Sequence, residues 1–511
     1  MSGKRSMVVN QLGGRELPKS LFILGFLLLL STRVAAQTYP QDFGYSRYSE
    51  VLLDAGVGWQ SNSMFHPLNI SGMDSPDSST GAFNWIDNQL NTFRNPYLEA
   101  SRASESALVG IGIVGLEARR QQGEGAAYDG IALASLIYGE LHFQSSWYVR
   151  SMFRVTNEAR SLPHYSGVSR GIARFGFNSS EVDQGAIGYE NEHLSVEYGR
   201  SREIWGADVE DNLILSGSAP SYESLKVEGR YNGFTYRYFY GFLEAFEDSA
   251  AGGVTERYIV GRGLEYRNGR SLVCGIGEVA ILSGVDRSLE WGYLNPLKLS
   301  YESRRSSSNA VWIGSVDWLA SSSLRLSGSF LVDRYRDSNN KPIFRSDLTG
   351  LQAHVAWTPY RSKVGVTALA DYARMGTYCL MDDSPYRQFS TRSQVLGNSI
   401  GNDADKLEAG LRVVYPIPVI SEFAFGTRRQ GEMSLLTEPY KVVVETPRKS
   451  FPSGQINSVS YVRYRLEWQP FVYVNASVTG QFSIAESGSF AKSGFTMFEL
   501  RLMTRPTAKV F

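Results

Sequence analysis

Hydrophobic and polar residues alternate with a period of two over much of this chain. From Leu141 to Val155 and from Phe234 to Phe242, mostly apolar or aromatic residues occupy one face, and polar residues occupy most of the other. Similar patterns recur over residues 310–318, 324–332 and 364–372. Successive side chains of a strand point to opposite faces, so a period of two is typical of β-structure. The sequence therefore predicts many short amphipathic strands.

The turns between these segments differ in length in a regular way. Two Asn-Gly pairs, beginning at Asn232 and Asn268, predict type I′ hairpins, and the linker between Leu243 and Glu256 is long. Farther along, tight turns at 321–323, 359–362, 416–418 and 469–470 alternate with long linkers at 334–347, 375–406, 428–457 and 486–494. Short turns on one rim and long loops on the other are typical of outer-membrane barrels. This asymmetry favours a barrel over a soluble β-sandwich.

The N-terminal residues predict export. Four basic residues precede an unbroken apolar run from Leu21 to Leu30, and small residues follow up to Ala36. Ten residues rise only about 15 Å in a helix, against about 30 Å for a membrane core. We therefore expect a cleavable signal peptide over residues 1–36 rather than a membrane anchor.

Together these patterns predict an all-β fold, a transmembrane antiparallel β-barrel of about 18 strands over residues 106–511. Residues 37–105 lack sustained alternation, and Trp85 to Leu98 has partly helical character. We expect this stretch to form a small periplasmic or plug-like region. The last amphipathic segment and the terminal Phe511 resemble the signal by which the barrel-assembly machinery recognises its substrates, so that machinery and outer-membrane lipid are expected partners.

Composition and charge narrow the function. Aromatic residues make up 13% of the chain, yet mean hydropathy is −0.22, as expected when a wet lumen dilutes the apolar positions. The 51 basic and 51 acidic residues balance, and no basic run stands out, so nucleic-acid binding is not expected. The two cysteines, Cys274 and Cys379, exclude a disulfide scaffold, and their pairing is left open.

No complete motif for catalysis is present in the sequence. The five histidines follow no metal-ligand spacing. The Gly-x-Ser-x-Gly spacing occurs at 167–171 and 397–401, but a nucleophile elbow also needs a strand before the serine and a helix after it, which a chain of short strands does not offer. We therefore expect no enzymatic activity, no metal and no cofactor. A barrel hydrolase with a Ser/His pair on neighbouring strands would escape such a motif search and remains an alternative.

One segment, 201–222, does not fit a plain wall. Strands of a barrel must alternate in direction, and the number of strands expected on either side of this segment has inconsistent parity and does not keep that alternation. Either Leu213 to Leu215 is therefore an extra strand or the segment folds into the lumen. Trp205 is expected to be a packing anchor rather than a sugar platform. Arg200 and Glu203 either line the lumen or balance each other.

The same region resembles a known family. Gly199-Arg200, Trp205-Gly206, and the run from Asn212 to Pro220, together with Glu278 and the run from Tyr293 to Leu297, resemble the Wzi capsule-assembly family. The matching positions that define the motif are Gly199, Arg200, Trp205, Gly206, Asn212, Leu213, Ser216, Pro220, Asn295 and Pro296. The resemblance implies a monomeric outer-membrane barrel of eighteen strands that acts as a surface lectin. Such a protein binds capsular or related exopolysaccharide and helps attach or assemble it at the cell surface.

The longest predicted loop offers candidate glycan-binding residues: Tyr378, Asp382, Asp383, Tyr386 and Arg387. Aromatic faces stack on sugar C–H surfaces, while carboxylates and guanidinium groups bond hydroxyls. Any solvated loop has a similar composition, so this assignment is a hypothesis. A porin for passive diffusion of small solutes is the alternative function, because it shares the same architecture.

Overall fold

The computed structural model describes most of the chain between residues 45 and 510, all within one compact unit, Val34–Phe511. The described residues are 45–56, 65–66, 81–90, 107–122, 130–143, 146–157, 179–207, 211–248, 253–298, 308–333, 345–382, 384–436, 450–471, 474–487, 493–502 and 508–510. The predicted signal peptide, residues 1–36, lies outside them. No helix among the described residues is both long and apolar enough to cross a membrane.

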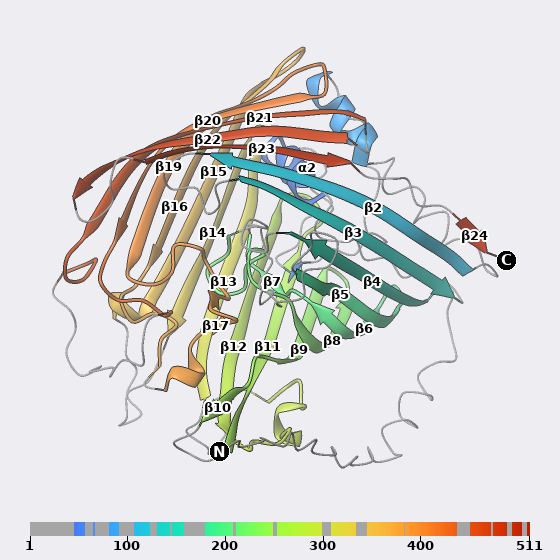
Figure 1. Cartoon of the computed structure of the whole chain (residues 1–511), viewed down its shortest axis with the longest axis vertical. Helices are drawn as coiled ribbons and strands as arrows, with labels where there is room; N and C mark the ends of the chain where they lie inside the picture. Colours follow the sequence, from blue (N-terminus) through green and yellow to red (C-terminus); the bar gives the residue numbers. More distant parts are fainter. Residues whose placement is uncertain are drawn as a thin grey trace, which may run out of the picture. The chain divides into compact units, whose positions relative to one another are not determined.

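Antiparallel strands form a closed ring in which β23 pairs with β2 (Figure 1). The main sheet has 20 strands, and eighteen remain in the ring without the short β10 (Phe246–Asp248) and β24 (Ala508–Val510). The ring runs β2 (Ala107–Gln122), β3 (Gly130–Phe143), β4 (Trp147–Thr156), β5 (Ser179–Glu190), β6 (Leu194–Ser201), β8 (Tyr222–Tyr231), β9 (Phe234–Phe242), β11 (Gly253–Arg267), β12 (Leu272–Val285), β13 (Ser308–Ser321), β14 (Leu324–Asp333), β15 (Thr349–Arg361), β16 (Gly365–Met375), β19 (Ala404–Val414), β20 (Val419–Gln430), β21 (Asn457–Phe471), β22 (Val474–Ser487) and β23 (Ser493–Leu502). The predicted barrel of about 18 strands is confirmed.

The two faces of the wall follow the alternation in the sequence. On β13 and β14, Ser315 and Ser329 face inward and share a hydrogen bond of 2.8 Å between their hydroxyl oxygens. One position along, Val316 and Phe330 face outward and remain exposed. Exposed apolar side chains continue around the ring, for example Leu264, Ile276, Leu351, Leu407, Phe425 and Leu466. The alternation of polar and apolar residues along each strand thus places a band of apolar side chains against the lipid.

The rims also differ as expected. Asn232 and Gly233 have φ of 48° and 81°, the left-handed pair that a type I′ hairpin needs. The type I′ prediction is wrong for the second Asn-Gly pair: Gly269 has φ of 70°, but Asn268 does not have a positive φ, and its side-chain oxygen accepts hydrogen bonds from the backbone N–H groups of residues 270–272 in a longer tight turn. The tight-turn rim carries exposed aromatic residues such as Trp318, Trp357 and Trp468 near the strand ends. Aromatic girdles of this kind mark the membrane interface. With short turns at the periplasmic rim, the long loops lie on the cell-surface side.

The N-terminal region contributes helices at the tight-turn end. Helix α2 (Tyr45–Asp54), the 3-10 turn η3 (Gly81–Phe83) and a helix over 84–90 pack around Val414 and Ile420. The indole of Trp85 donates to the carbonyl of Tyr415 at 3.0 Å. The expected partial helix from Trp85 is present up to residue 90, and residues 91–98 lie outside the described chain. Helix α2 was not predicted.

Segment 201–222 folds into the lumen, which resolves the parity problem. Strands β6 and β8 pair directly, so the residues between them add no strand to the wall. Its two-residue strand β7 (Ile204–Trp205) pairs instead with β1 (Phe65–His66) from the N-terminal region. Leu213 and Ile214 are fully buried in the main apolar cluster of the barrel interior.

The loop between β16 and β19 also enters this cluster. It carries the 3-10 turn η8 (Pro385–Arg387) and a small hairpin of β17 (Ser390–Thr391) and β18 (Gln394–Val395). Phe389 and Leu396 are fully buried there. Cys379 belongs to this interior cluster, whereas Cys274 lies on β12, and both cysteines are free. The remaining 3-10 turns are η5 (Trp291–Tyr293) and η7 (Ser346–Leu348).

Candidate functional site in the barrel lumen

Trp205 anchors the segment that fills one side of the lumen. Its ring packs edge-on against Phe65 and Phe239, with centroid separations of 4.8 and 5.4 Å. Its indole N–H donates to Glu203 at 3.1 Å, and its backbone N–H donates to Leu215 at 3.0 Å. The ring is fully buried, so it offers no face to a sugar and has a packing role.

Two glycines of the family motif hold backbone shapes that a side chain would block. Gly199 and Gly206 have φ of 152° and 144°, values that L-residues rarely adopt. A Cβ at Gly199 would lie 2.1 Å from the Gly185 carbonyl oxygen, and one at Gly206 would lie 2.0 Å from the Asn212 side chain. Both positions therefore require glycine where the chain leaves the wall.

Arg200 and Glu203 have different partners. Arg200 donates through Nε to the Ser221 hydroxyl at 3.1 Å. Glu203 pairs with Lys226 at 2.6 Å and lies 3.7 Å from Arg237. Both residues therefore help fix segment 201–222 to the inner wall.

The structure does not bring all the motif residues together. Asn212, Leu213, Ser216 and Pro220 are buried in the lumen. Asn295 and Pro296 are exposed in the loop after β12, where the Tyr236 hydroxyl donates to the Pro296 carbonyl. Tyr238 similarly donates to Tyr293 at 2.6 Å, so this part of the motif packs against β9.

The predicted glycan-binding loop is largely built into the interior. Tyr378 is only 5% exposed, and its backbone N–H donates to Asp347, so its ring presents little surface to a ligand. Asp382 is 7% exposed and accepts a hydrogen bond from Arg387 at 2.7 Å. Tyr386 stays partly exposed beside Phe246, with ring centroids 5.8 Å apart. Asp383 lies outside the described residues.

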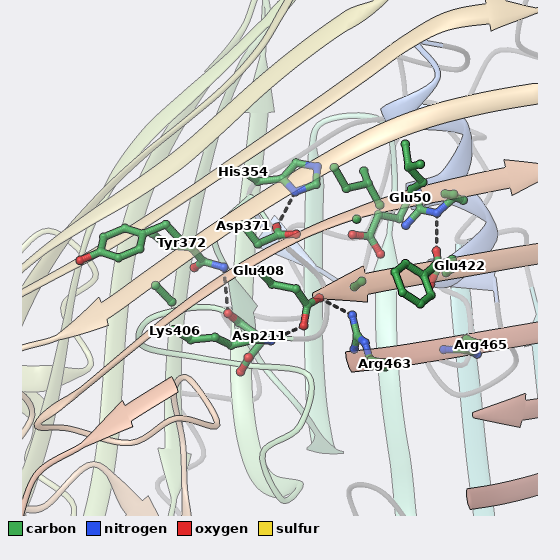
Figure 2. Close-up of a pocket in the computed structure, with 18 of the residues that line it drawn as sticks. Glu50, Asp211, His354, Asp371, Tyr372, Lys406, Glu408, Glu422, Arg463 and Arg465 are labelled. Atoms are coloured by element: carbon green, nitrogen blue, oxygen red, sulfur yellow. Dashed lines mark hydrogen bonds and ion pairs between the residues drawn. The ribbon is translucent and has the colours of Figure 1, made fainter. Parts of the chain in front are cut away.

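Beside this plugged region, a polar cavity of about 230 Å³ lies within the barrel (Figure 2). Strands β15, β16, β19, β20, β21 and β22 form its wall, and Glu50 of α2 and Asp211 of the inserted segment also line it. Its charged wall residues are His354, Asp371, Lys406, Glu408, Arg412, Glu422, Arg463 and Arg465. The alternation along the strands places these side chains on the inner face.

Along part of this wall the cations are more accessible than the carboxylates. Arg463 pairs with Glu408, and their side chains are 42% and 6% exposed. Arg465 and Glu467, 3.3 Å apart, are 32% and 5% exposed. Lys406 also approaches Glu408, at 3.6 Å. On the neighbouring strand β16, Asp371 lies in register with Glu408, is 41% exposed and bonds His354 at 2.6 Å, so donors and acceptors both face the space.

Asp54, at the end of α2, fixes the helix to this wall. Its carboxylate pairs with Arg325 and Arg412 at 2.6 Å each and with His354 at 3.1 Å. Burial alone would raise the pKa of Asp54, but His354 and the two arginines hold that pKa well below its usual range. Because His354 and Arg412 also line the cavity, the helix and the cavity share one charge network.

This arrangement suits a hydroxyl-rich ligand. Guanidinium and ammonium groups donate to hydroxyl, carboxylate or phosphate oxygens, and carboxylates accept from hydroxyl groups. Within the described residues, no group of three or more His, Cys, Asp or Glu side chains is arranged to hold a metal ion.

Several of these residues escaped the sequence reasoning. Lys406, Glu408 and Arg463 stand at ordinary polar positions of alternating segments, and Asp54 follows a short apolar run. The available signal was the spacing of charged residues two or four positions apart, as in Lys406, Glu408 and Arg412. That spacing identifies an inner face but not which inner residues border a cavity.

Comparisons with known proteins place the fold. No protein-family model matches the sequence, and no curated protein matches it. Among solved structures, the chain is similar to Wzi of Escherichia coli, a carbohydrate-binding β-barrel involved in group 1 capsule assembly. The identity is 11%, the match covers 91% of this chain and 99% of that one, and the TM-score is 0.60.

Other matches are weaker. OprD of Pseudomonas aeruginosa is 9% identical, with 79% of this chain and 95% of that chain covered and a TM-score of 0.47. OccAB2 of Acinetobacter baumannii is 8% identical, with 79% and 99% covered and a TM-score of 0.45. These scores are too low to separate one function from another. The chain is an outer-membrane β-barrel, and its fold is that of Wzi, as the sequence motifs led us to expect.

Proposed function

We propose that this protein binds capsular or related exopolysaccharide and helps attach or assemble it at the cell surface. The observation that carries the proposal is the packed interior. Segment 201–222 and the β16–β19 loop join one apolar cluster with inner wall residues such as Phe239 and Ile313. A pore for diffusing solutes needs a continuous wet path, and this packing opposes one.

The cavity chemistry supports a glycan ligand. The accessible side chains of Arg463 and Arg465 can donate hydrogen bonds to sugar oxygens, and Asp371 can accept them from sugar hydroxyl groups. A polysaccharide of hydroxylated and acidic sugars needs both kinds of partner. The long loops lie on the same side as a surface polysaccharide. Tyr386, the partly exposed aromatic residue of the predicted loop, remains a candidate stacking residue there. No catalytic step, metal or cofactor enters the proposal, and the barrel acts as a monomer.

Deleting the gene in an encapsulated host tests the proposal. Polysaccharide should be released into the medium while its total synthesis is unchanged, and a plasmid copy should restore retention. Retention that is unchanged by the deletion contradicts the proposal.

Variants connect the phenotype to the cavity. A plasmid copy carrying Arg463→Gln and Arg465→Gln should restore retention poorly, because both accessible guanidinium groups are lost. Arg270→Gln is the matched control, since Arg270 is an exposed arginine in a tight turn of the periplasmic rim and does not line the cavity. Equal retention with both plasmids would exclude the cavity as the binding site.

Passive diffusion remains the alternative, because the cavity is a polar space within the barrel. Conductance of the purified full-length protein in planar bilayers separates the two functions. Little or no steady conductance is expected for the surface lectin. Large, stable channels would favour the porin and contradict the lectin.

A further inference from the structure

A basic cluster lies on the outer face of the wall, away from the lumen. Asp405 on β19 pairs in register with Arg374 on β16 and with Arg429 on β20. Two residues along β19, Leu407 is 54% exposed, and on β20 Phe425 is 53% exposed. Residues two or four positions apart on a strand share a face, so this trio faces the membrane side of the barrel.

The cluster stands at the cell-surface end of the membrane band. Arg374, Asp405 and Arg429 are each one residue from the end of their strand at the long-loop rim. In a bacterial outer membrane, this level holds the headgroups of the outer leaflet. Two guanidinium groups and one carboxylate leave a surplus positive charge there.

Both arginines are held in place. Arg429 donates to Asp405 through Nε at 2.9 Å and through a second nitrogen, yet its side chain is still 47% exposed. The guanidinium carbon of Arg374 lies 4.1 Å from the centroid of the Phe451 ring. Cation–π stacking restricts the Arg374 side chain, and the Asp405 carboxylate restricts that of Arg429, before any ligand arrives.

An apolar surface continues directly below the cluster. Leu411 and Phe423 are 52% and 56% exposed on the same face of β19 and β20, beyond Leu407 and Phe425. A ligand that fits this surface has an anionic headgroup and hydrocarbon chains running down the wall. Phosphate suits paired guanidinium groups because it accepts bidentate hydrogen bonds.

We propose that Arg374 and Arg429 bind a phosphate group of an outer-leaflet glycolipid, whose acyl chains lie along Leu407 and Phe425. This site is separate from the lumen cavity and does not depend on the proposed polysaccharide binding. It gives the barrel a fixed lipid partner beside the β16–β19 loop.

Native mass spectrometry of the purified full-length barrel in detergent tests this site. The probes are bisphosphorylated lipid A and its dephosphorylated form, added separately. The wild type should retain the phosphorylated lipid, and the double variant Arg374→Gln with Arg429→Gln should bind it about tenfold more weakly. Heat-modified gel mobility confirms that each variant is folded.

Arg270→Gln provides the control, because it removes an exposed arginine from the periplasmic rim. It should leave lipid retention unchanged. Equal retention of the two lipid forms by the wild type, or equal loss in the control and the double variant, would overturn the proposal. Displacement of the lipid by an equal concentration of inorganic phosphate would also overturn it, because the acyl chains would then add nothing.

Discussion

The two sides of the lumen are built differently. Along β11 and β12 the inner positions include Gly263 and Gly277, where an added Cβ would lie 2.5 Å from Phe65 and 2.8 Å from Trp205. Along β19 and β21 the inner positions carry long charged side chains such as Lys406 and Arg463. The small residues of β11 and β12 let the inserted segment pack closely against the wall, and the charged Lys226 and Arg237 nearby bind it through Glu203. The charged inner residues of β19 and β21 instead border the polar cavity.

The largest effect is expected from removing the anchor of the filled side. Trp205→Ala should lower the free energy of unfolding in detergent by about 3–5 kcal/mol, because a fully buried ring leaves a cavity. Planar-bilayer recordings should then show channel openings that the wild type lacks. Trp205→Phe, which keeps an aromatic ring, should have a smaller effect. Wild-type stability in Trp205→Ala would contradict the anchor role.

The attachment of α2 provides the second test. Asp54→Asn keeps the size of the side chain but leaves Arg325 and Arg412 without their shared carboxylate. Breaking a buried ion pair in this way costs about 3–5 kcal/mol. Hydrogen exchange should increase in α2 while the strands of the wall stay protected. Unchanged protection of α2 would show that Asp54 does not fix the helix.

The same carboxylate predicts how the attachment responds to acid. Because the pKa of Asp54 is held below its unfolded value of about 3.9, its contribution is present above that pH and is lost as pH falls through the lower folded value. Protection of α2 should therefore persist at pH 5 and decline only well below pH 4. The Asp54→Asn variant should lack this acid transition. A wild-type transition near pH 6 would contradict the assignment to Asp54.

A smaller change tests the close packing on the filled side. Gly277→Ala places a methyl group 2.8 Å from the Trp205 ring and should cost about 1–3 kcal/mol of unfolding free energy. Gly314→Ala is the matched control on the neighbouring strand, since its nearest contact would be at 4.0 Å. Chemical denaturation of both variants gives the comparison. Equal stabilities would show that the insert does not pack tightly on β12.

The weakest effect on stability is expected for a residue on the side of the lumen that borders the polar cavity. Arg463→Gln removes a guanidinium group that is 42% exposed, so the unfolding free energy should change by about 0–1 kcal/mol. Polysaccharide affinity should fall nonetheless, because the same group faces the cavity. A large loss of stability would mean that Arg463 is a structural residue like those of the filled side.

The sequence predicted the parts of the fold that depend on local periodicity. Alternation and the Asn232-Gly233 and Asn268-Gly269 turns identified the strands and oriented the barrel. Segment 201–222 was recognised as irregular, but parity alone could not choose between an extra strand and an insert. That choice depends on contacts with Phe65 and Phe239, which lie far away in the sequence.

The site was harder to predict for the same reason. Tyr378 and Asp382 have the composition of a solvated loop, yet the loop folds into the interior against residues of other strands. Arg463 and Lys406 looked like ordinary inner-face residues. Only the position of the insert, packed on the opposite side, leaves space beside them.

Direct binding of the host's own purified polysaccharide to the immobilised full-length barrel tests the central claim. Surface plasmon resonance in detergent should show saturable binding to the wild type and clearly weaker binding to the Arg463→Gln and Arg465→Gln double variant. Binding should be unchanged in Arg270→Gln. No saturable binding to the folded wild-type protein would contradict the account.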